Sequence, residues 1–378
     1  MIASQRHLFS IPEDVHYLNC AYMAPLSHAV SAAMVEGARL KEQPWTFFPQ
    51  DFFSLVETFR EKAGRLVGTS PDNLAVVPSV SYGLAVAAAN LSLGEGRRVV
   101  TLGEQFPSNV YPWQELAQRE GGEVIAVRRE AEACWTAAVL DAIDADTAIV
   151  ALPHCHWADG RVVDLVTVGE KCRNVGAALV LDLTQSLGAM PVDFDAVKPD
   201  FAVAACYKWL MGPYGIGILY VDPKHHGARP IEQNWINRAG SQDFTRLVDY
   251  RSDYQPGARR FDMGEKSNAP SMMGAGAALD FLLDHSVGQI AETLAYKTTR
   301  LAEKAAELGL TSAPVGKRAP HFLSLEFPDG LPDGLTEKLG EAKVFVSARG
   351  QSLRVTPHLY NTEADEEALL ATLHKVLG

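Results

Sequence analysis

The sequence predicts an α/β fold with two parts: a large domain, in which a mostly parallel sheet is sandwiched by helices, and a smaller α+β domain. From about residue 73 to residue 221, short apolar runs alternate with segments of helical pattern, and this order is typical of doubly wound sheets. The apolar runs are nearly continuous Val, Ile, Leu and Ala, which indicates strands covered on both faces. The chain of 378 residues also exceeds the usual size of a single core.

The elements of the large domain follow from these runs. Strands are expected at residues 73–79, 97–103, 123–128, 147–153, 177–183, 201–206 and 215–221, and helices at 81–91, 111–120 and 162–176. Sheets of this kind bind ligands beyond the carboxyl ends of their strands. Polar residues at those ends are therefore the first candidates for function.

The pattern changes after residue 222, where a polar and irregular segment reaches residue 262. Beyond it, helices are expected at 270–286, 288–308 and 363–377, and strands at 321–327 and 343–349 flank a further polar helix. The first 20 residues are expected to pack with this second part. The prediction is therefore a large domain of residues 21–255 and a small α+β domain of residues 1–20 and 256–378.

Charge and composition exclude several classes of function. The 46 acidic and 34 basic residues give a net charge of -12, which argues against a nucleic-acid partner. The five cysteines are odd in number and include no CxxC pair, so buried, reduced thiols in a cytoplasmic protein are expected. The N-terminus has no apolar signal core and no run reaches the length of a membrane span, so no membrane association is expected.

A lysine inside an apolar, glycine-rich stretch is the first candidate for chemistry. Lys208 follows the apolar run FAVAAC and stands in CYKWLMGPYGIG. Buried lysines are rare because removing an ammonium from water is costly. Lys208 is thus either a salt-bridged structural lysine or a nucleophile whose pKa is lowered by its surroundings.

Asp182 gives the second indication, since it ends the apolar run AALVLD. If the strands that end at Asp182 and lead to Lys208 share a sheet, both side chains face one crevice. A lysine and a carboxylate there suit pyridoxal phosphate, whose aldehyde forms a Schiff base with lysine and whose pyridine nitrogen pairs with a carboxylate. A role for Asp182 as a helix cap or turn residue is the alternative.

A phosphate site is expected where the strand at 73–79 turns into a helix. Ser79 and Ser81 stand at this turn, and the free N–H groups of a helix start bind phosphate; ordinary helix capping is the alternative. The glycines of GPYGIG do not form a dinucleotide fingerprint, because their order is wrong and a strand follows them.

Long stretches of the chain resemble the class V aminotransferase group of fold type I pyridoxal-phosphate enzymes. The most specific is LVLDLTQSLGAMPVDFDAVKPDFAVAACYKWLMGPYGIGILYV. The resemblance continues, in the expected order, in EQFPSNVYPW, HCHWADG, RFDMGEKSN and SLRVTPHLYNTEADEEAL. The group includes cysteine desulfurases, kynureninases, isopenicillin N epimerase-like proteins and carbon–sulfur lyases.

The resemblance implies a role for each matched residue. Lys208 matches the Schiff-base lysine, Asp182 the partner of the pyridine nitrogen, and Arg354 the arginine that binds the substrate carboxylate. The other implied cofactor contacts are Gln185 near the phenolic oxygen, Phe106 stacked on the ring, Val80, Ser81 and Tyr207 at the phosphate, Trp157 in the cavity wall, and Ser267 and Asn268 at the phosphate of a partner subunit. Tyr22, Asn109, Trp113 and Trp157 are the candidates for contact with the substrate side chain.

Two departures from the family pattern narrow the expected reaction. Trp157 stands where desulfurases have an asparagine, which favours the kynureninase-like and epimerase-like side of the group. The loop FVSARGQSLR has no cysteine before Arg354, so cysteine desulfuration is disfavoured.

We therefore expect a homodimeric pyridoxal-phosphate enzyme that acts on an α-amino acid, with amino transfer as the first choice of reaction. The alternatives are a lyase of the kynureninase or carbon–sulfur type, an amino-acid epimerase, and a non-catalytic pyridoxal-phosphate-binding protein. His154 and His156 flank Cys155, but no further cluster of ligands completes a metal site, and none is expected.

Overall fold

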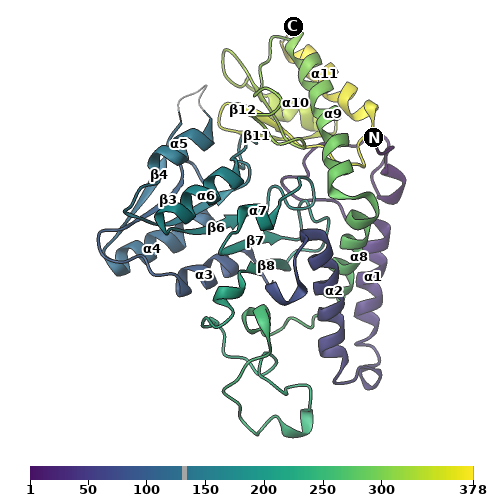
Figure 1. The fold of residues 1–378 in the computed structure, drawn as a ribbon. Helices are drawn as coiled ribbons and strands as arrows, with labels where there is room; N and C mark the ends of the chain where they lie inside the picture. Colours follow the sequence, from purple (N-terminus) through teal and green to yellow (C-terminus); the bar gives the residue numbers. More distant parts are fainter. Residues whose placement is uncertain (130–133, 378) are drawn as a thin grey trace.

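The computed structural model describes residues 1–129 and 134–377. Its centre is a seven-stranded sheet with the order β2-β8-β7-β6-β5-β3-β4, which runs across the middle of Figure 1. The strands are β2 (Leu74–Val77), β3 (Arg98–Leu102), β4 (Glu123–Val127), β5 (Thr147–Pro153), β6 (Ala178–Asp182), β7 (Phe201–Ala205) and β8 (Gly217–Val221).

One strand of this sheet runs against the others. β8 pairs antiparallel with both β7 and β2, and the remaining neighbours pair parallel. A parallel return needs a crossover of about a dozen residues or more, usually with a helix, and residues 206–216 contain neither α-helix nor strand. β8 therefore turns straight back along β7. The prediction of a mostly parallel sheet is confirmed.

Helices cover both faces of the sheet. The helices of this part are α3 (Val80–Asn90), α4 (Tyr111–Glu120), α5 (Trp135–Ala142), α6 (Leu165–Val175) and α7 (Phe194–Val197). α3 and α4 share one hydrophobic core with one set of alternate strand residues, and α5, α6 and α7 share another core with the opposite set. The expected helices at 81–91, 111–120 and 162–176 are all present. α5 was not predicted, because a short apolar segment has no clear periodicity.

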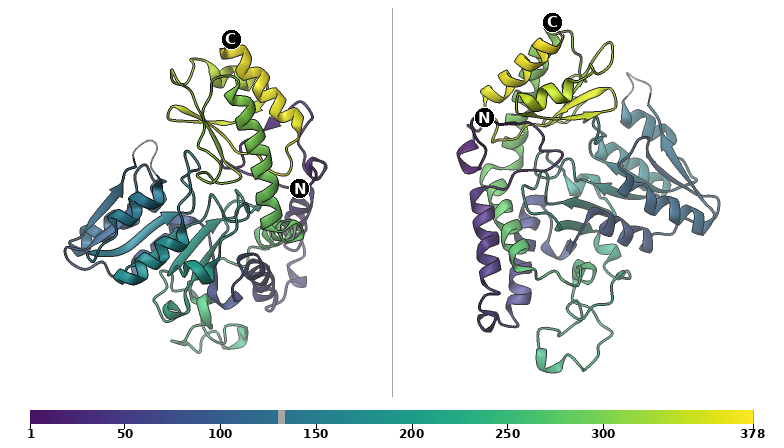
Figure 2. Two further views of the ribbon diagram at one scale, coloured as in Figure 1. Left: turned by 45° about the horizontal axis from the view of Figure 1, so that its top comes forward. Right: turned by 180° about the vertical axis from the view of Figure 1, so that it is seen from behind.

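Three long helices lie side by side along one edge of the molecule (Figures 1 and 2). They are α1 (His28–Arg39), α2 (Asp51–Val67) and α8 (Ala269–His285). The approach of α1 to α8 is close at Gly37, where an added Cβ would lie 2.7 Å from the Ala269 carbonyl group. α8 was expected from the sequence, whereas α1 and α2 were not predicted.

The C-terminal part has its own antiparallel sheet, with the order β11-β12-β9. Its elements are α9 (Val287–Ala306), β9 (Leu323–Glu326), α10 (Leu335–Glu341), β10 (Val344–Phe345), β11 (Ser347–Arg349), β12 (Ser352–Val355) and α11 (Glu363–Leu377). A separate hydrophobic core joins these elements. The expected strand at 343–349 is divided into β10 and β11.

The N-terminal residues return to this C-terminal part. β1 (His16–Tyr17) pairs parallel with β10, so the N-terminal segment lies beside the C-terminal part (Figure 1). The domain boundaries at residues 20/21 and 255/256 stay a prediction. Over the ranges 1–129 and 134–377, the fold has no helix with the length and apolar character needed to cross a membrane.

Candidate active site

The carboxyl ends of the parallel strands surround a cavity of about 250 Å³. Asp182 is the last residue of β6, and the segment after β7 leads to Lys208. Because these two strands are parallel neighbours, with Asp182 opposite Val203, both side chains face the same cavity, as predicted. Eight of the predicted residues line it: Val80, Ser81, Phe106, Trp157, Asp182, Gln185, Tyr207 and Lys208.

The Lys208 ammonium lies in an enclosed position, and the residue is 8% exposed. Its Nζ is 5.4 Å from the ring centroid of Tyr207 and 5.6 Å from that of Phe106. Burial lowers the pKa of Lys208 to about 8, although the negative charge of Asp182 opposes the shift. The positive charges of Arg354 and Arg349 contribute to this lowering. A lysine with these surroundings is a much better nucleophile at neutral pH than an ordinary one.

Asp182 is buried beside this lysine, and burial raises the pKa of its carboxyl. Its Oδ1 accepts a hydrogen bond from the Thr184 backbone N–H at 3.0 Å, which holds the carboxylate at the end of β6. The positive charge of Lys208 favours the ionised form. A carboxylate with few partners of its own is suited to pair with a protonated ring nitrogen.

The start of α3 forms another wall of the cavity. Ser79 caps the helix, and its Oγ accepts a hydrogen bond from the Tyr82 backbone N–H at 3.1 Å. The Ser79 and Ser81 hydroxyls are 2.9 Å apart. The free backbone N–H groups of Val80 and Ser81, with two hydroxyls, form the type of site that binds phosphate. The capping and phosphate interpretations of these serines are therefore compatible.

Aromatic rings line part of the cavity. Phe106 and Trp157 meet edge to face with their ring centroids 5.6 Å apart. The Trp157 indole N–H donates to the Glu104 carbonyl oxygen at 2.7 Å, which fixes the orientation of its ring. Tyr207 packs against Tyr214 at a centroid distance of 4.5 Å. A planar aromatic ligand would find a large contact area here.

Gln185 is oriented by residues that sequence reasoning missed. Its Oε1 accepts from the Trp209 indole N–H at 2.9 Å, and its Nε2 donates to the Ala21 carbonyl oxygen at 3.2 Å. The His321 Nε2 lies 2.6 Å from the Gln185 backbone carbonyl oxygen. Trp209 directly follows Lys208 in the chain, and this adjacency was the one feature of the sequence that could have indicated a place near the site. No feature of the sequence indicated the contact of His321 with Gln185.

Arg354, on β12 of the C-terminal part, is not among the residues that line the cavity but contacts one of them. It is 1% exposed, and its Nη1 donates to the Trp157 carbonyl oxygen at 2.9 Å. Within residues 1–129 and 134–377, its buried Nε has no hydrogen-bond partner. Burial lowers the pKa of the guanidinium to about 9, and Arg349, a second arginine that the sequence did not reveal, adds to the effect. This buried cation has donors available for an anionic ligand.

The remaining candidates lie outside the Lys208 cavity. The Asn109 side chain is fully buried and accepts from the Trp113 indole N–H at 2.9 Å, so this pair stabilises the start of α4. Tyr22 is 58% exposed, in the segment whose Ala21 carbonyl contacts Gln185.

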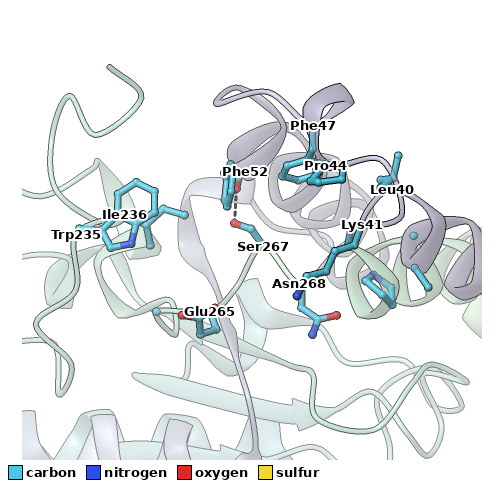
Figure 3. A pocket seen from close by; sticks show the side chains of 15 residues that line it. Leu40, Lys41, Pro44, Phe47, Phe52, Trp235, Ile236, Glu265, Ser267 and Asn268 are labelled. Carbon is cyan, nitrogen blue, oxygen red and sulfur yellow. Dashed lines mark hydrogen bonds between the residues drawn. The ribbon is translucent and has the colours of Figure 1, made fainter. Parts of the chain in front are cut away.

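Ser267 and Asn268 line a different cavity of about 850 Å³ between α1, α2 and the segment before α8 (Figure 3). The Ser267 hydroxyl donates to the Phe52 carbonyl oxygen, and the Asn268 side chain caps α8. Within one chain they do not contribute to the Lys208 cavity.

All five cysteines are free, and four of them are buried. The Cys155 thiol donates to the Gln185 carbonyl oxygen at 3.4 Å. Among the described residues, no group of three or more His, Cys, Asp and Glu side chains is arranged to hold a metal ion.

These residues fit pyridoxal phosphate. A lysine of lowered pKa can bind the aldehyde, a buried carboxylate can pair with the ring nitrogen, and a helix start with two hydroxyls can hold the phosphate. The edge-to-face pair of Phe106 and Trp157 can supply an aromatic contact for the cofactor ring. The fold and the cavity thus define a pyridoxal-phosphate-dependent enzyme.

Comparison with known proteins gives the family. The sequence of residues 42–366 matches the family model of aminotransferase class-V, so the chain belongs to that family. It is 28% identical over 339 residues to the uncharacterized aminotransferase YcbU of Bacillus subtilis, a match that covers 84% of each chain. It is 24% identical to isopenicillin N epimerase of Amycolatopsis lactamdurans, over 99% of this chain and 98% of the relative.

The solved structure of the cystine C–S lyase C-DES, in complex with cysteine persulfide, has a similar fold. The TM-score is 0.86 at 20% identity, and the alignment covers 96% of this chain and 98% of the lyase. These findings confirm the predicted family, fold class, enzyme class and cofactor.

Proposed function

We propose that this enzyme acts on an α-amino acid through Lys208 and that its reaction is amino transfer. The observation that carries the first part is the position of Arg354. Its buried guanidinium contacts Trp157, whose side chain lines the cavity of Lys208. A substrate whose amine reaches Lys208 can therefore present a carboxylate to Arg354, and a guanidinium fork fits a carboxylate bidentately.

Asp182, Arg354 and Lys208 would each have a separate role in this reaction. Pyridoxal phosphate, when bound, holds the substrate nitrogen covalently and draws electrons from the neighbouring carbon. Asp182 would hold a proton on the pyridine nitrogen, and Arg354 would orient the substrate carboxylate. Lys208, with a pKa of about 8, would take the proton from the α-carbon of the substrate and deliver it to the carbon on the cofactor side of the same nitrogen, as a general base and acid with a pKa near neutral pH does.

Amino transfer needs fewer proton-moving groups in the cavity than epimerisation by two bases does. Of the described residues that line this cavity, Lys208 is the one that carries an amine, and the rings of Phe106 and Trp157 occupy another wall. Amino transfer needs one group that moves a proton between two atoms on one face of the cofactor. Epimerisation by two bases would need a second group on the opposite face, and Tyr207 and Tyr214, which also line the cavity, are the side chains that could supply it. Lyase chemistry stays the alternative, because it also needs one base.

Product analysis of the holoenzyme tests this proposal. A panel of amino acids is added, the visible absorbance of the cofactor is followed, and the products are identified. Amino transfer gives the 2-oxo acid with its side chain intact, elimination gives a shortened product, and epimerisation gives the D-amino acid. Borohydride reduction and peptide mapping should place the cofactor on Lys208. An adduct on another lysine, or no spectral change with any amino acid, would refute the proposal.

The Arg354→Lys variant tests the carboxylate contact. It keeps the charge but loses the fork, and a hydrogen bond between charged groups contributes about 2–3 kcal/mol. The Michaelis constant for an amino acid should rise accordingly, while the affinity for pyridoxal phosphate should stay the same. Loss of the cofactor from this variant, or a preference for an amine without a carboxylate, would contradict the assignment.

We further propose a homodimer in which Ser267 and Asn268 of one subunit complete the phosphate site of the other. Two observations support it. Both residues lie outside their own Lys208 cavity, and they line a large cavity beside Trp235 and Phe47 (Figure 3). Exposed apolar side chains are frequent in the two segments that border this cavity: Trp45, Phe48, Trp235, Leu247, Val248 and Tyr250. Such surfaces are typical of subunit interfaces.

Mixed subunits provide a sharp test. Lys208→Ala lacks the catalytic amine, and Asn268→Ala lacks a donor to the partner's site, so each homodimer should be inactive or weak. A heterodimer of the two variants would contain one site with both defects and one intact site. Activity should therefore return when the two are mixed, up to about half per dimer. A mixture that stays inactive, or an active monomer in sedimentation, would contradict the composite site.

A further inference from the structure

A second arginine lies beside Arg354 on the β11–β12 hairpin. Ser347 pairs with Arg354 and Arg349 pairs with Ser352 across the two strands. Side chains of directly paired residues lie on the same face of a sheet, and so do those two positions apart on one strand. Arg349 and Arg354 therefore project from the same face as diagonal neighbours, at a typical spacing of about 7–8 Å.

Both guanidinium groups converge on Trp157. Arg354 donates to its carbonyl oxygen at 2.9 Å, and the Arg349 Cζ lies 5.7 Å from the centroid of its indole ring. Trp157 lines the cavity of Lys208, whereas its neighbours His156 and Ala158 line a second cavity of about 780 Å³, together with Arg349. The Trp157 segment thus separates the cavity of Lys208, here called the inner cavity, from the second cavity, here called the outer cavity. Arg349 lies in the outer cavity, next to this segment.

Arg349 has no anionic partner within the part of the chain that the structure describes. Its Nη1 donates to the carbonyl oxygen of Ala348, and its Nε is buried without a hydrogen-bond partner. The nearby carboxylates have other partners. Asp159 lies 2.8 Å from Arg129 and 3.5 Å from Arg161, and Glu326 lies 3.8 Å from Arg161. Glu104, the third acid of the outer cavity, is exposed to solvent.

Placing the guanidinium groups of Arg349 and Arg354 side by side, away from water and with unused hydrogen-bond donors, costs free energy. Like charges at this distance repel, and removing a guanidinium from water adds to the cost. Arg349 is also one of the groups that lower the pKa of Lys208 and of Arg354, which agrees with a short distance to both. An anion at each guanidinium would remove the cost.

We propose that Arg349 binds an acidic group on the substrate side chain, so that the substrate is an α-amino acid with a second carboxylate or a comparable anion. This inference rests on the proposed function and deepens it. The amine lies at Lys208 and the α-carboxylate at Arg354. The side chain then passes Trp157 toward the outer cavity, where its terminal anion meets Arg349. The diagonal spacing of the two arginines matches a substrate with two anionic ends.

Pairs of acidic and neutral amino acids test the inference. The holoenzyme is assayed with glutamate against glutamine, with aspartate against asparagine, and with cysteine sulfinate. The wild-type enzyme should prefer the acidic member by about 10-fold to 100-fold in kcat/KM, which is the range for one charge-assisted hydrogen bond. In Arg349→Gln the preference should fall to near unity, while the rates with the neutral members should change little. Arg349→Lys should keep part of the preference.

A binding measurement provides a readout without turnover. Succinate and glutarate carry two carboxylates, and propionate and butyrate are their matched monoacids. Calorimetry on the holoenzyme should show tighter binding of the diacids, and Arg349→Gln should remove that difference. The control is Arg119→Gln, which changes an arginine on α4 whose side chain is 56% exposed and should leave both ratios unchanged.

The outcomes separate this inference from the proposed function. If the wild-type enzyme turns over amino acids without preference for acidic side chains, the inference is wrong and the proposed function stands. If Arg349→Gln lowers kcat/KM equally for acidic and neutral substrates, Arg349 contacts the α-carboxylate or stabilises the fold, and the inference is again wrong. If no amino acid reacts and diacids bind no better than monoacids, both the proposed function and the inference about Arg349 are wrong.

Discussion

Lys208 and Asp182 were predicted because each ends an apolar run, and parallel strands place such ends at one edge of the sheet. That reasoning needs only the local sequence. Arg349 and His321 were missed because their approach to Trp157 and Gln185 depends on how the C-terminal part packs onto the sheet. His321 is 136 positions away from Gln185 in the chain, and no local pattern records such a contact.

At the residue level, the lowered pKa of Lys208 gives a kinetic prediction. An ammonium cannot attack an aldehyde, so capture of pyridoxal phosphate by the apoprotein should speed up as Lys208 loses its proton. The pKa is about 8, so the rate should rise around pH 8 and not around the ordinary lysine value of about 10.4. Stopped-flow absorbance over a series of pH values would measure this.

Neutralising a nearby cation should shift that profile. In Arg354→Gln the ammonium of Lys208 loses a repulsive neighbour, so its pKa and the midpoint of the rate profile should rise. The exposed Arg119→Gln variant should leave the profile unchanged. A midpoint that stays the same in Arg354→Gln would show that Arg354 does not act on the charge of Lys208.

Asp182 leads to a second prediction at this level. Asp182→Asn keeps the shape of the side chain but cannot stabilise a proton on the pyridine nitrogen. The variant should still bind pyridoxal phosphate, but kcat should fall by about 100-fold or more, as expected for loss of a fixed charge that stabilises the transition state. Steady-state rates and the cofactor content of the purified variant would be measured together. A rate near that of the wild type would refute the role.

At the level of elements, the strands of the sheet were easier to predict than the hairpin that carries the arginines. The strand expected at 147–153 coincides with β5 (Thr147–Pro153), because its residues are apolar and buried on both faces. β12 contains only four residues, Ser352–Val355, and its start is set by a turn at Gly350, whose φ is +57°. Short strands that depend on a turn give little periodic signal.

The two serines at the start of α3 should have separable roles. Ser79 accepts the hydrogen bond from Tyr82 that caps the helix, so Ser79→Ala should lower the free energy of unfolding of the apoprotein by about 1 kcal/mol. Ser81 does not cap and loses only an exposed contact with the Ser79 hydroxyl, so Ser81→Ala should change that stability less than Ser79→Ala does and should weaken the binding of pyridoxal phosphate. Urea denaturation and a cofactor titration would compare them. Equal losses of stability in both variants would contradict this division.

At the level of the whole molecule, a buried charge cluster joins distant parts of the chain. Asp262 lies at its centre and accepts from Arg60 of α2 at 2.7 Å and from Lys266 at 2.8 Å. Its Oδ1 also accepts from the Val76 backbone N–H of β2 at 2.7 Å. Lys266 in turn donates to Asn237 at 2.8 Å. The cluster therefore fixes the segment that ends at Ser267 against the edge of the central sheet.

Burial opposes the ionisation of Asp262, but Arg60 and Lys266 outweigh it and hold the pKa of the carboxyl below its usual value. A carboxyl whose pKa is lowered by folding contributes stability above its unfolded pKa of about 3.9 and loses that contribution as the pH falls through the folded value. The stabilising effect of Asp262 should therefore be complete at neutral pH and should disappear only in strong acid.

The Asp262→Asn variant tests the importance of this cluster for the whole fold. The amide leaves Lys266 buried without its ion-pair partner and leaves Arg60 with Glu57, 3.2 Å away. Breaking a buried ion pair in this way typically costs about 3–5 kcal/mol. Urea denaturation of the apoprotein at pH 7 should show a loss of this size. The control is Asp280→Asn, which removes the solvent-exposed pair with Lys62, 2.7 Å apart, and should cost no more than about 1 kcal/mol. Because the cluster positions the segment of Ser267 and Asn268, Asp262→Asn should also weaken the proposed dimer at protein concentrations where the control variant stays associated. Equal stabilities of the two variants would show that the cluster is not needed to hold this segment in place.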